Sequence, residues 1–224
     1  MPRLYPFIIL VVVLFGCSAK KDQVESSDIQ QSYTGDPATG KLLYATCVPC
    51  HGDAGQGNRK MNAPALANLD SWYLNHQLLN FSKGIRGDSQ TDTLGFQMAA
   101  MAKTLKDSVA VADVVAYINT LPDATLIASL SGDIKKGERT YQSVCGSCHG
   151  SGAKGNELMN APRLSGTDDW YLKRQLVNFK NSVRGAHPDD KLGAQMVPMS
   201  ALLADEEAVN NVIAYIVSHT SQAK

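Results

Sequence analysis

Residues 47–51 read Cys-Val-Pro-Cys-His, and residues 145–149 read Cys-Gly-Ser-Cys-His. In both pentapeptides two cysteines are separated by two residues, and a histidine follows the second cysteine directly. Two thiols one helical turn apart can add to the vinyl groups of a haem, and the next imidazole can reach its iron. The sequence therefore predicts two covalently bound haem c groups. The attachment cysteines and iron-binding histidines are Cys47, Cys50 and His51, and Cys145, Cys148 and His149.

The similarity between the two copies extends well beyond the cysteines. Residues 61–66 match residues 159–164, and residues 94–101 match residues 192–199, all at the same offset of 98 residues and without a gap. Self-similarity at a fixed period is typical of duplicated domains. We predict domain 1 at residues 33–121, a connector at 122–131 and domain 2 at 132–224.

Apolar residues recur at helical spacing in each copy. Aspartate, a preferred N-cap residue, precedes several of these runs. In the first copy, the expected helices are a short one through residues 40–47, one from Asp70 to near Gly84, and a last one from Asp107 or Ser108. In the second copy, the corresponding helices run from Asp168 or Asp169 to near Gly185, and from Asp205 onward. No alternating strand pattern stands out, so the predicted fold class is all-α, as a tandem duplication.

The first residues have the pattern of a secretory signal: one positive charge, an apolar run over residues 4–15, and a glycine before Cys17. Residues 14–17 resemble a bacterial lipobox, in which the cysteine is lipidated. An uncleaved membrane anchor is the alternative, although the run is shorter than the roughly 20 residues of a spanning helix. Residues 18–32 are polar and predict a flexible tether. We expect a periplasmic protein, lipid-anchored to the inner or outer membrane, with residues 1–17 as its signal peptide.

Composition and the surroundings of the cysteines argue against several other classes of protein. With 21 basic and 21 acidic residues, the chain lacks the single-sign field of a nucleic-acid-binding protein. Net charge is similarly balanced in the two copies, so it does not assign a docking face. A zinc site would need further ligands beside each cysteine pair, and a thioredoxin-like motif would need a βαβ context. Neither is present in the sequence pattern.

The sixth iron ligand has two candidates in each copy. Met98 and Met196 stand 47 residues after the motif histidines, and Met101 and Met199 follow three residues later. Thioether sulfur is a neutral, soft ligand that raises the reduction potential. The repeat itself does not choose between them. From residues 36 to 219 the chain resembles dihaem class I cytochromes c of the cytochrome c4 type, and that resemblance implies Met98 and Met196, seven residues before Leu105 and Leu203.

Further repeated residues are candidates for the surroundings of the two haems. Pro64 and Pro162 resemble the class I proline whose carbonyl orients the ligand histidine; plain loop residues are the alternative. Arg86 and Arg184 match haem propionates in charge and geometry, or are solvated surface charges. Trp72 and Trp170 are expected to line the core or the haem wall. The histidines without a repeated partner, His76, His187 and His219, are expected at the surface.

These residues predict an electron carrier rather than an enzyme. The resemblance implies transfer between respiratory donors, such as a quinol-oxidising complex, and a terminal oxidase or reductase. Two alternatives stay open: a dihaem peroxidase, and a haem subunit that acts only within an oxidase complex. A peroxidase needs an open or displaceable iron position in one half, whereas both halves here keep Gln-Met-x-x-Met, at residues 97–101 and 195–199.

Overall fold

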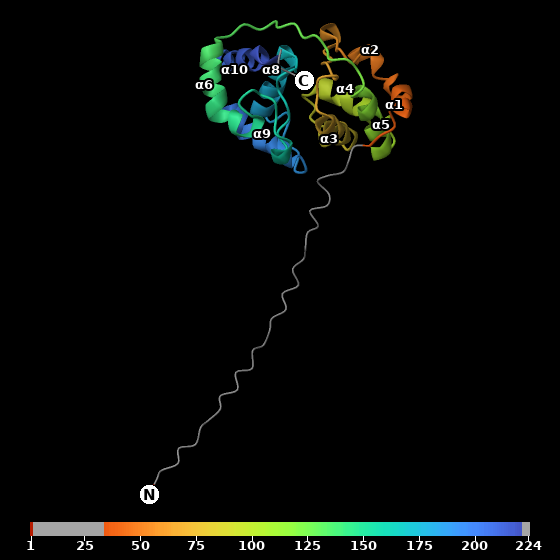
Figure 1. Cartoon of the computed structure of the whole chain (residues 1–224), viewed down its shortest axis with the longest axis horizontal. Helices are drawn as coiled ribbons and strands as arrows, with labels where there is room; N and C mark the ends of the chain where they lie inside the picture. Colours follow the sequence, from red (N-terminus) through yellow and green to blue (C-terminus); the bar gives the residue numbers. More distant parts are fainter. Residues whose placement is uncertain (2–33, 221–224) are drawn as a thin grey trace. The chain divides into compact units, whose positions relative to one another are not determined.

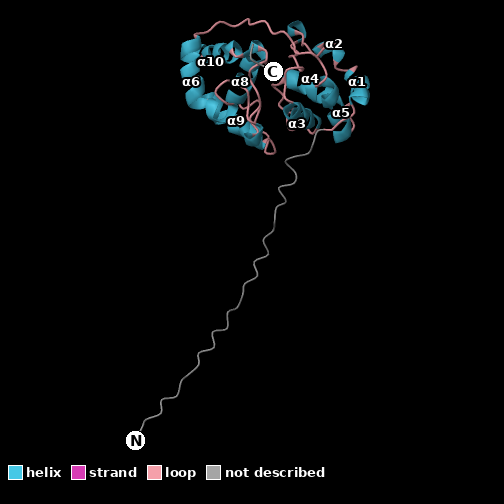
Figure 2. Cartoon of the chain, viewed as in Figure 1, coloured by secondary structure: helices cyan, strands magenta, loops and turns pink. Residues whose placement is uncertain are grey.

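The computed structural model describes Met1 and residues 34–220. The expected lipidation site Cys17 and the expected tether at 18–32 lie outside the described residues. Residues 34–220 fall within one compact unit. Figures 1 and 2 show that this part is built from helices and loops, with only two isolated β-bridges, Asn58 to Ala63 and Asn156 to Ala161. The all-α prediction is confirmed.

The two halves contain the same series of helices in the same order (Figure 1). The first half has α1 (Pro37–Tyr44), α2 (Val48–His51), a 3-10 turn (Arg59–Met61), α3 (Ser71–Ser82), α4 (Thr93–Ala102) and α5 (Ser108–Ile118). The second half has α6 (Ile134–Val144), α7 (Gly146–His149), a 3-10 turn (Glu157–Met159), α8 (Asp169–Lys180), α9 (Lys191–Ala201) and α10 (Glu206–Ser218). Among the described helices, none has both the length and the apolar character needed to cross a bilayer.

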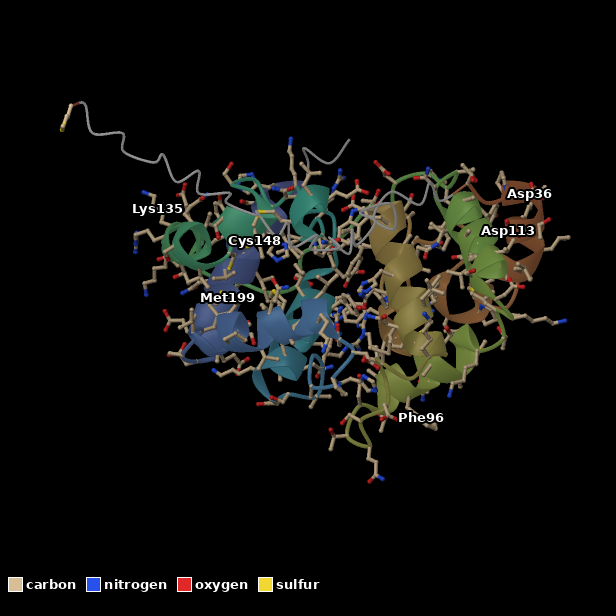
Figure 3. The ribbon with its side chains drawn as sticks, turned by 90° about the horizontal axis from the view of Figure 1, so that it is seen from below. Asp36, Phe96, Asp113, Lys135, Cys148 and Met199 are labelled. Carbon is tan, nitrogen blue, oxygen red and sulfur yellow. The ribbon has the colours of Figure 1, made fainter. Side chains whose placement is uncertain are left out.

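The first and last helices of each half cross at close range. In the first half, Asp36 caps α1 through the backbone N–H groups of Ala38 and Thr39. Its own N–H donates to Asp113 Oδ1 on α5 at 2.7 Å (Figure 3). A Cβ on Gly40 would lie 1.9 Å from the Asp113 carbonyl oxygen, so only glycine permits this approach. Gly137 on α6 does the same against α10.

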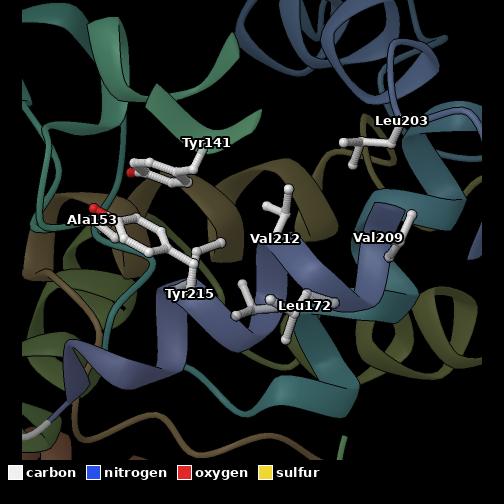
Figure 4. Packing of buried hydrophobic residues seen from close by; sticks show 9 residues of the cluster. Tyr141, Ala153, Leu172, Leu203, Val209, Val212 and Tyr215 are labelled. Carbon is white, nitrogen blue, oxygen red and sulfur yellow. The ribbon is translucent and has the colours of Figure 1, made fainter. Parts of the chain in front are cut away.

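A tyrosine on each first helix joins the core to the loop that follows the haem motif. Tyr44 and Tyr141 are almost fully buried, and their hydroxyls donate to the carbonyls of Gly52 and Gly150, each at 2.9 Å. Figure 4 shows Tyr141 beside Tyr215 of α10, with their ring centroids 5.1 Å apart. The aliphatic core residues around the two tyrosines contribute about 1.5–3 kcal/mol each when fully buried. They are Leu74, Leu105, Val111, Val114, Val115 and Ile118 in the first half, and Leu172, Leu203, Val209, Val212, Ile213 and Ile216 in the second.

The predicted helix boundaries are right where a local cap determines them. Asp107 and Asp205 begin the last helices and accept from the N–H groups of Ala110 and Ala208. The predicted end near Gly185 is wrong, because α8 stops at Lys180. Asp70 and Asp168 do precede α3 and α8, but neither side chain caps its own helix.

Those two aspartates instead bond to the other half of the chain. Asp168 Oδ2 accepts from the Ala65 N–H at 2.8 Å, and Asp70 Oδ2 accepts from the Arg163 N–H at 3.1 Å. The two bonds occupy equivalent positions in the repeat. The two bonds therefore connect the halves by equivalent contacts. Ala65 and Arg163 directly follow Pro64 and Pro162, the prolines expected near the ligand histidines.

Candidate haem sites

Each haem motif lines a cavity. The first cavity is lined by Cys47, Cys50 and His51 and has a volume of about 170 Å³; the second is lined by Cys145, Cys148 and His149 and has about 320 Å³. A single water needs about 10–15 Å³ of such space. Both cavities are therefore large enough for a bulky organic group, and their walls are mostly apolar side chains.

Both motif histidines are held in one orientation. His51 and His149 are 5% and 6% exposed, and their Nδ1 atoms lie 2.8 Å from the carbonyl oxygens of Pro64 and Pro162. A carbonyl oxygen can only accept, so Nδ1 carries the proton and Nε2 keeps its lone pair. Burial lowers the pKa of both imidazoles, against the opposing effect of the proline carbonyls. A neutral imidazole with a free Nε2 is the form that binds a metal.

The first cysteine of each motif is not activated as a redox thiol would be. Burial raises the pKa of Cys47 and raises the pKa of Cys145 to about 11. Catalytic Cys-x-x-Cys thiols have a lowered pKa. Among residues 34–220, no group of three or more histidine, cysteine and acidic side chains lies together as a metal site of protein ligands would require.

Met98 and Met101 on α4, like Met196 and Met199 on α9, line the cavities. The inner pair is the better shielded: Met98 and Met196 are half-buried, and Met98 packs against a cluster with Phe81. Met101 and Met199 are 43% and 39% exposed. Figure 3 labels Met199 in the same half as Cys148, which lines the same cavity. The difference in burial favours Met98 and Met196 as iron ligands.

Arg86 and Arg184 are not solvated surface charges. They are 7% and 8% exposed, and each reaches into the other half. Arg86 donates to Gln77 Oε1 (2.7 Å), Tyr171 Oη (2.9 Å) and Gln175 Oε1 (2.8 Å). Arg184 donates to Gln175 Oε1 (2.8 Å), Tyr73 Oη (3.0 Å) and Gln77 Oε1 (2.9 Å). The two glutamines therefore each accept from both guanidinium groups.

These two buried cations have no counter-charge of their own. Neither forms an ion pair among the described residues, and the Nε atom of each has no hydrogen-bond partner there. Burial alone would lower the pKa of Arg86, but the hydroxyls of Tyr171 and Tyr73, with a smaller effect of Asp92, outweigh it and raise the pKa. A buried, charged and incompletely bonded guanidinium at a cavity wall fits an anionic group in that cavity. The carboxylates of a haem meet that requirement.

The sequence did not single out the residues that complete this network. Tyr73, Gln77, Tyr171 and Gln175 line both cavities. Their conservation between the two copies at the 98-residue offset was the available signal. The expectation of a surface position for His76 is wrong, because His76 is half-buried and lines the second cavity with Trp72.

Two other histidines were also expected at the surface, and both are half-buried. His187 Nδ1 accepts from the N–H of Asp189, and His219 stacks edge-on against Tyr215 with ring centroids 4.7 Å apart. Neither lines either of the two candidate haem cavities.

Comparison with known proteins agrees with this geometry. The cytochrome c family model matches the chain twice, over residues 37–122 and 134–220. Reduced recombinant cytochrome c4 from Pseudomonas stutzeri has a similar structure, with a TM-score of 0.63 and 25% identity over 82% of this chain and 98% of that chain. The chain is thus built of two tandem cytochrome c domains. It belongs to the cytochrome c family, as a dihaem class I c-type cytochrome, and such domains imply covalently bound haem c.

Two curated relatives show the range of proteins with similar sequences. One is the cbb3-type cytochrome c oxidase subunit FixP of Rhizobium etli, 31% identical over 75% of this chain. This chain spans only 64% of that relative's length. The other is the thiosulfate dehydrogenase electron acceptor of Thiomonas intermedia, 31% identical over 64% of this chain and 67% of the relative. The similarity therefore supports electron transfer as the general activity.

Proposed function

We propose that this chain is a dihaem electron carrier with one haem c on Cys47 and Cys50 and a second on Cys145 and Cys148. His51 and Met98 would hold the iron in the first site, and His149 and Met196 would hold it in the second. The observation that best supports the proposal is the buried histidine whose Nδ1 donates to a proline carbonyl, in a cavity that also holds a half-buried methionine. A filled sixth position leaves the iron to electron exchange.

The protein's contribution is to position and shield the group. When bound, haem c supplies a one-electron change of iron oxidation state. Pro64 and Pro162 fix the histidine rings, and the apolar walls exclude water, which limits reorganisation on electron transfer. Arg86 and Arg184 neutralise the carboxylates while they stay inside the protein. Because each arginine bonds to both halves, one network orients both groups.

The partners and the location follow from the same proposal. The carrier lies in the periplasm, attached to a membrane through lipid on Cys17, and passes electrons from a donor such as a quinol-oxidising complex to a terminal oxidase or reductase. The similarity to an oxidase subunit also favours a second candidate, a haem subunit that acts within an oxidase complex. Copurification of oxidase subunits with the untagged, membrane-extracted protein separates that candidate from a free carrier. Replacement of Cys17 by serine releases the protein from the membrane if the lipid anchor is present.

A redox titration followed by visible spectra tests the central proposal. The wild-type protein shows two one-electron transitions and a methionine–iron charge-transfer band from both oxidised haems. Met98→Leu removes about half of that band and lowers one potential, because the thioether favours ferrous iron. Met101→Leu is the matched control and leaves the band intact. A high-spin haem in the wild-type protein would contradict the carrier and favour the peroxidase alternative.

A further inference from the structure

The two halves differ in charge around the openings of their cavities. The rim of the first cavity consists of the 3-10 turn Arg59–Met61 and residues 101–106, because the exposed side chains of Met61, Met101 and Thr104 line that cavity. The equivalent rim of the second cavity consists of Glu157–Met159 and residues 199–204. The methionines of the two rims match, so they do not distinguish the cavities.

The residues between those methionines do distinguish them. The first rim carries four exposed cations, whereas the second carries an acid and three uncharged side chains at the same repeat positions. The paired positions are Arg59 and Glu157, Lys60 and Leu158, Lys103 and Ala201, and Lys106 and Ala204. At all four positions the first rim is the more positive of the two. The whole chain has equal numbers of basic and acidic residues, so this difference in charge is local.

None of the four cations of the first rim forms an ion pair among the described residues, although Arg59 lies close enough to Asp168 to oppose the rise in the pKa of that carboxyl caused by burial. The acid nearest in sequence to Lys103 and Lys106, Asp107, caps α5 and recurs as Asp205, so it does not contribute to the difference. Asp53, nearest to Arg59 and Lys60, is replaced by Ser151 in the second half. Beyond Asp205 the second half adds Glu206 and Glu207, which pair with Lys173 and Lys136. The first rim is thus positive and the second is not.

A fifth cation reinforces the first rim from the other half of the chain. Arg174 lines the first cavity and donates to the carbonyl of Asn62, beside Met61, at 3.0 Å. The repeat-equivalent residue is His76, which lines the second cavity. Burial lowers the pKa of His76, with a smaller opposing effect of Asp190 and additional lowering by Arg184 and Lys83. The second cavity also has a wall cation of its own, Arg163 in place of Ala65, but Arg163 pairs with Asp70.

We propose that the first rim is the docking surface for a redox protein with an acidic face, and that this partner exchanges electrons through the first site. The proposal rests on the proposed function, since it requires a haem in each cavity. Exposed Met61 and Met101 supply the apolar centre of such an interface, and the cations supply its polar margin. Unpaired charges around a contact site steer an oppositely charged partner and raise association rates about 10- to 10³-fold at low salt.

The two copies provide matched variants. Lys60→Leu with Lys103→Ala and Lys106→Ala gives the first rim the residues of the second rim at three of the four positions and leaves Arg59 unchanged. Leu158→Lys with Ala201→Lys and Ala204→Lys is the reciprocal change. All six positions are exposed, and each new residue already occupies the equivalent place in the same fold. Oxidation of the reduced holoprotein is followed by stopped-flow absorbance with ferricyanide, with tris(bipyridine)cobalt(III) as a cationic oxidant, and with oxidised plastocyanin as an acidic redox protein.

We expect the first-rim variant to react about tenfold more slowly than wild type with ferricyanide and plastocyanin in about 10 mM salt, where the Debye length is about 30 Å. The difference should disappear near 1 M salt, and the cationic oxidant should react faster. The reciprocal variant should gain rate with both anionic probes. Unchanged rates with plastocyanin, or slowing with ferricyanide alone, would overturn the docking proposal. Spectra and potentials are recorded first: absence of two methionine-ligated haems in the wild type refutes the proposed function, whereas intact haems with unchanged rates refute only the docking surface.

Discussion

Replacement of Gly40 by alanine tests whether the helix crossing supports the first haem site. The added Cβ would lie 1.9 Å from the carbonyl oxygen of Asp113 and 2.5 Å from its carbon. Contacts below 3.0 Å are essentially never observed for a Cβ, so α1 and α5 must separate by about 1.1 Å or more. The obstructing atoms belong to backbone, and no side-chain rotation relieves the collision.

The size of the effect follows from two opposing contributions. Overpacking of this kind costs about 1–3 kcal/mol, and the rigid backbone places Gly40→Ala at the upper end. The better helix propensity of alanine returns about 1 kcal/mol. We expect a net loss of about 2 kcal/mol in the free energy of unfolding. Residues 34–220 lie within one compact unit, and for a unit of 150–250 residues this corresponds to a decrease in Tm of roughly 4–8 °C.

Thermal unfolding of the holoprotein measures this decrease. Far-UV circular dichroism reports the loss of the helices, and absorbance of the methionine–iron band reports the loss of the haem sites. Both signals should be lost together at the lower temperature, because the two halves lie within one compact unit. Gly152→Ala is the control: its nearest neighbour, Lys154 Cε, is 3.9 Å from the new Cβ, so stability should change by less than about 0.5 kcal/mol. A Gly40→Ala protein as stable as the Gly152→Ala protein would refute the reasoning.

Three further predictions concern charged groups. Burial alone would raise the pKa of Asp169, but hydrogen bonds from the connector and from Trp170 outweigh it and lower the pKa. The ionised carboxylate therefore stabilises the fold above its ordinary pKa of 3.8. Urea unfolding should show that Asp169→Asn costs about 1–3 kcal/mol at pH 7 and less at pH 3. Tyr171→Phe removes one acceptor from a buried guanidinium and should cost about 1.5–3 kcal/mol in the same assay, and a loss below 0.5 kcal/mol would contradict the network. Arg174→His should lower the reduction potential of the first haem, and His76→Arg should raise that of the second, because a nearby cation stabilises ferrous iron. Spectroelectrochemistry measures both potentials, and shifts of the opposite sign would refute the assignment of the two residues to the two sites.

The features that could be predicted from the sequence are those set by a few neighbouring residues. The caps at Asp107 and Asp205 and the position of the haem motif depend on contacts within one or two turns. The helices α4 and α9 were not predicted, because glycine within the first turn of each weakens the helix pattern. In the structure a Cβ on Gly95 would lie 2.1 Å from the carboxylate of Asp92, which caps α4. A larger residue at this position would therefore require the Asp92 side chain to shift.

The contacts between the halves could not be predicted for a different reason. The sequence marked Arg86 and Arg184 as candidates for haem carboxylates because both copies keep them. It contained no indication that each guanidinium bonds to Tyr and Gln of the other copy. Helical periodicity determines which face of a helix is buried, but not which residues of a second domain lie against that face. The burial of His76 was missed for the same reason.

The crossed arrangement has a consequence for how two equal copies can acquire unequal roles. Residues that bond to both halves, such as Gln77 and Gln175, act on both cavities at once, so a change in either would shift both sites together. A difference between the sites must instead come from residues that face one cavity only. Arg174 and His76 are such a pair, and the cations of the first rim are others. Because a permanent positive charge beside one iron favours its reduced state, identical ligands in the two sites are compatible with different potentials, and with one site that faces an acidic partner.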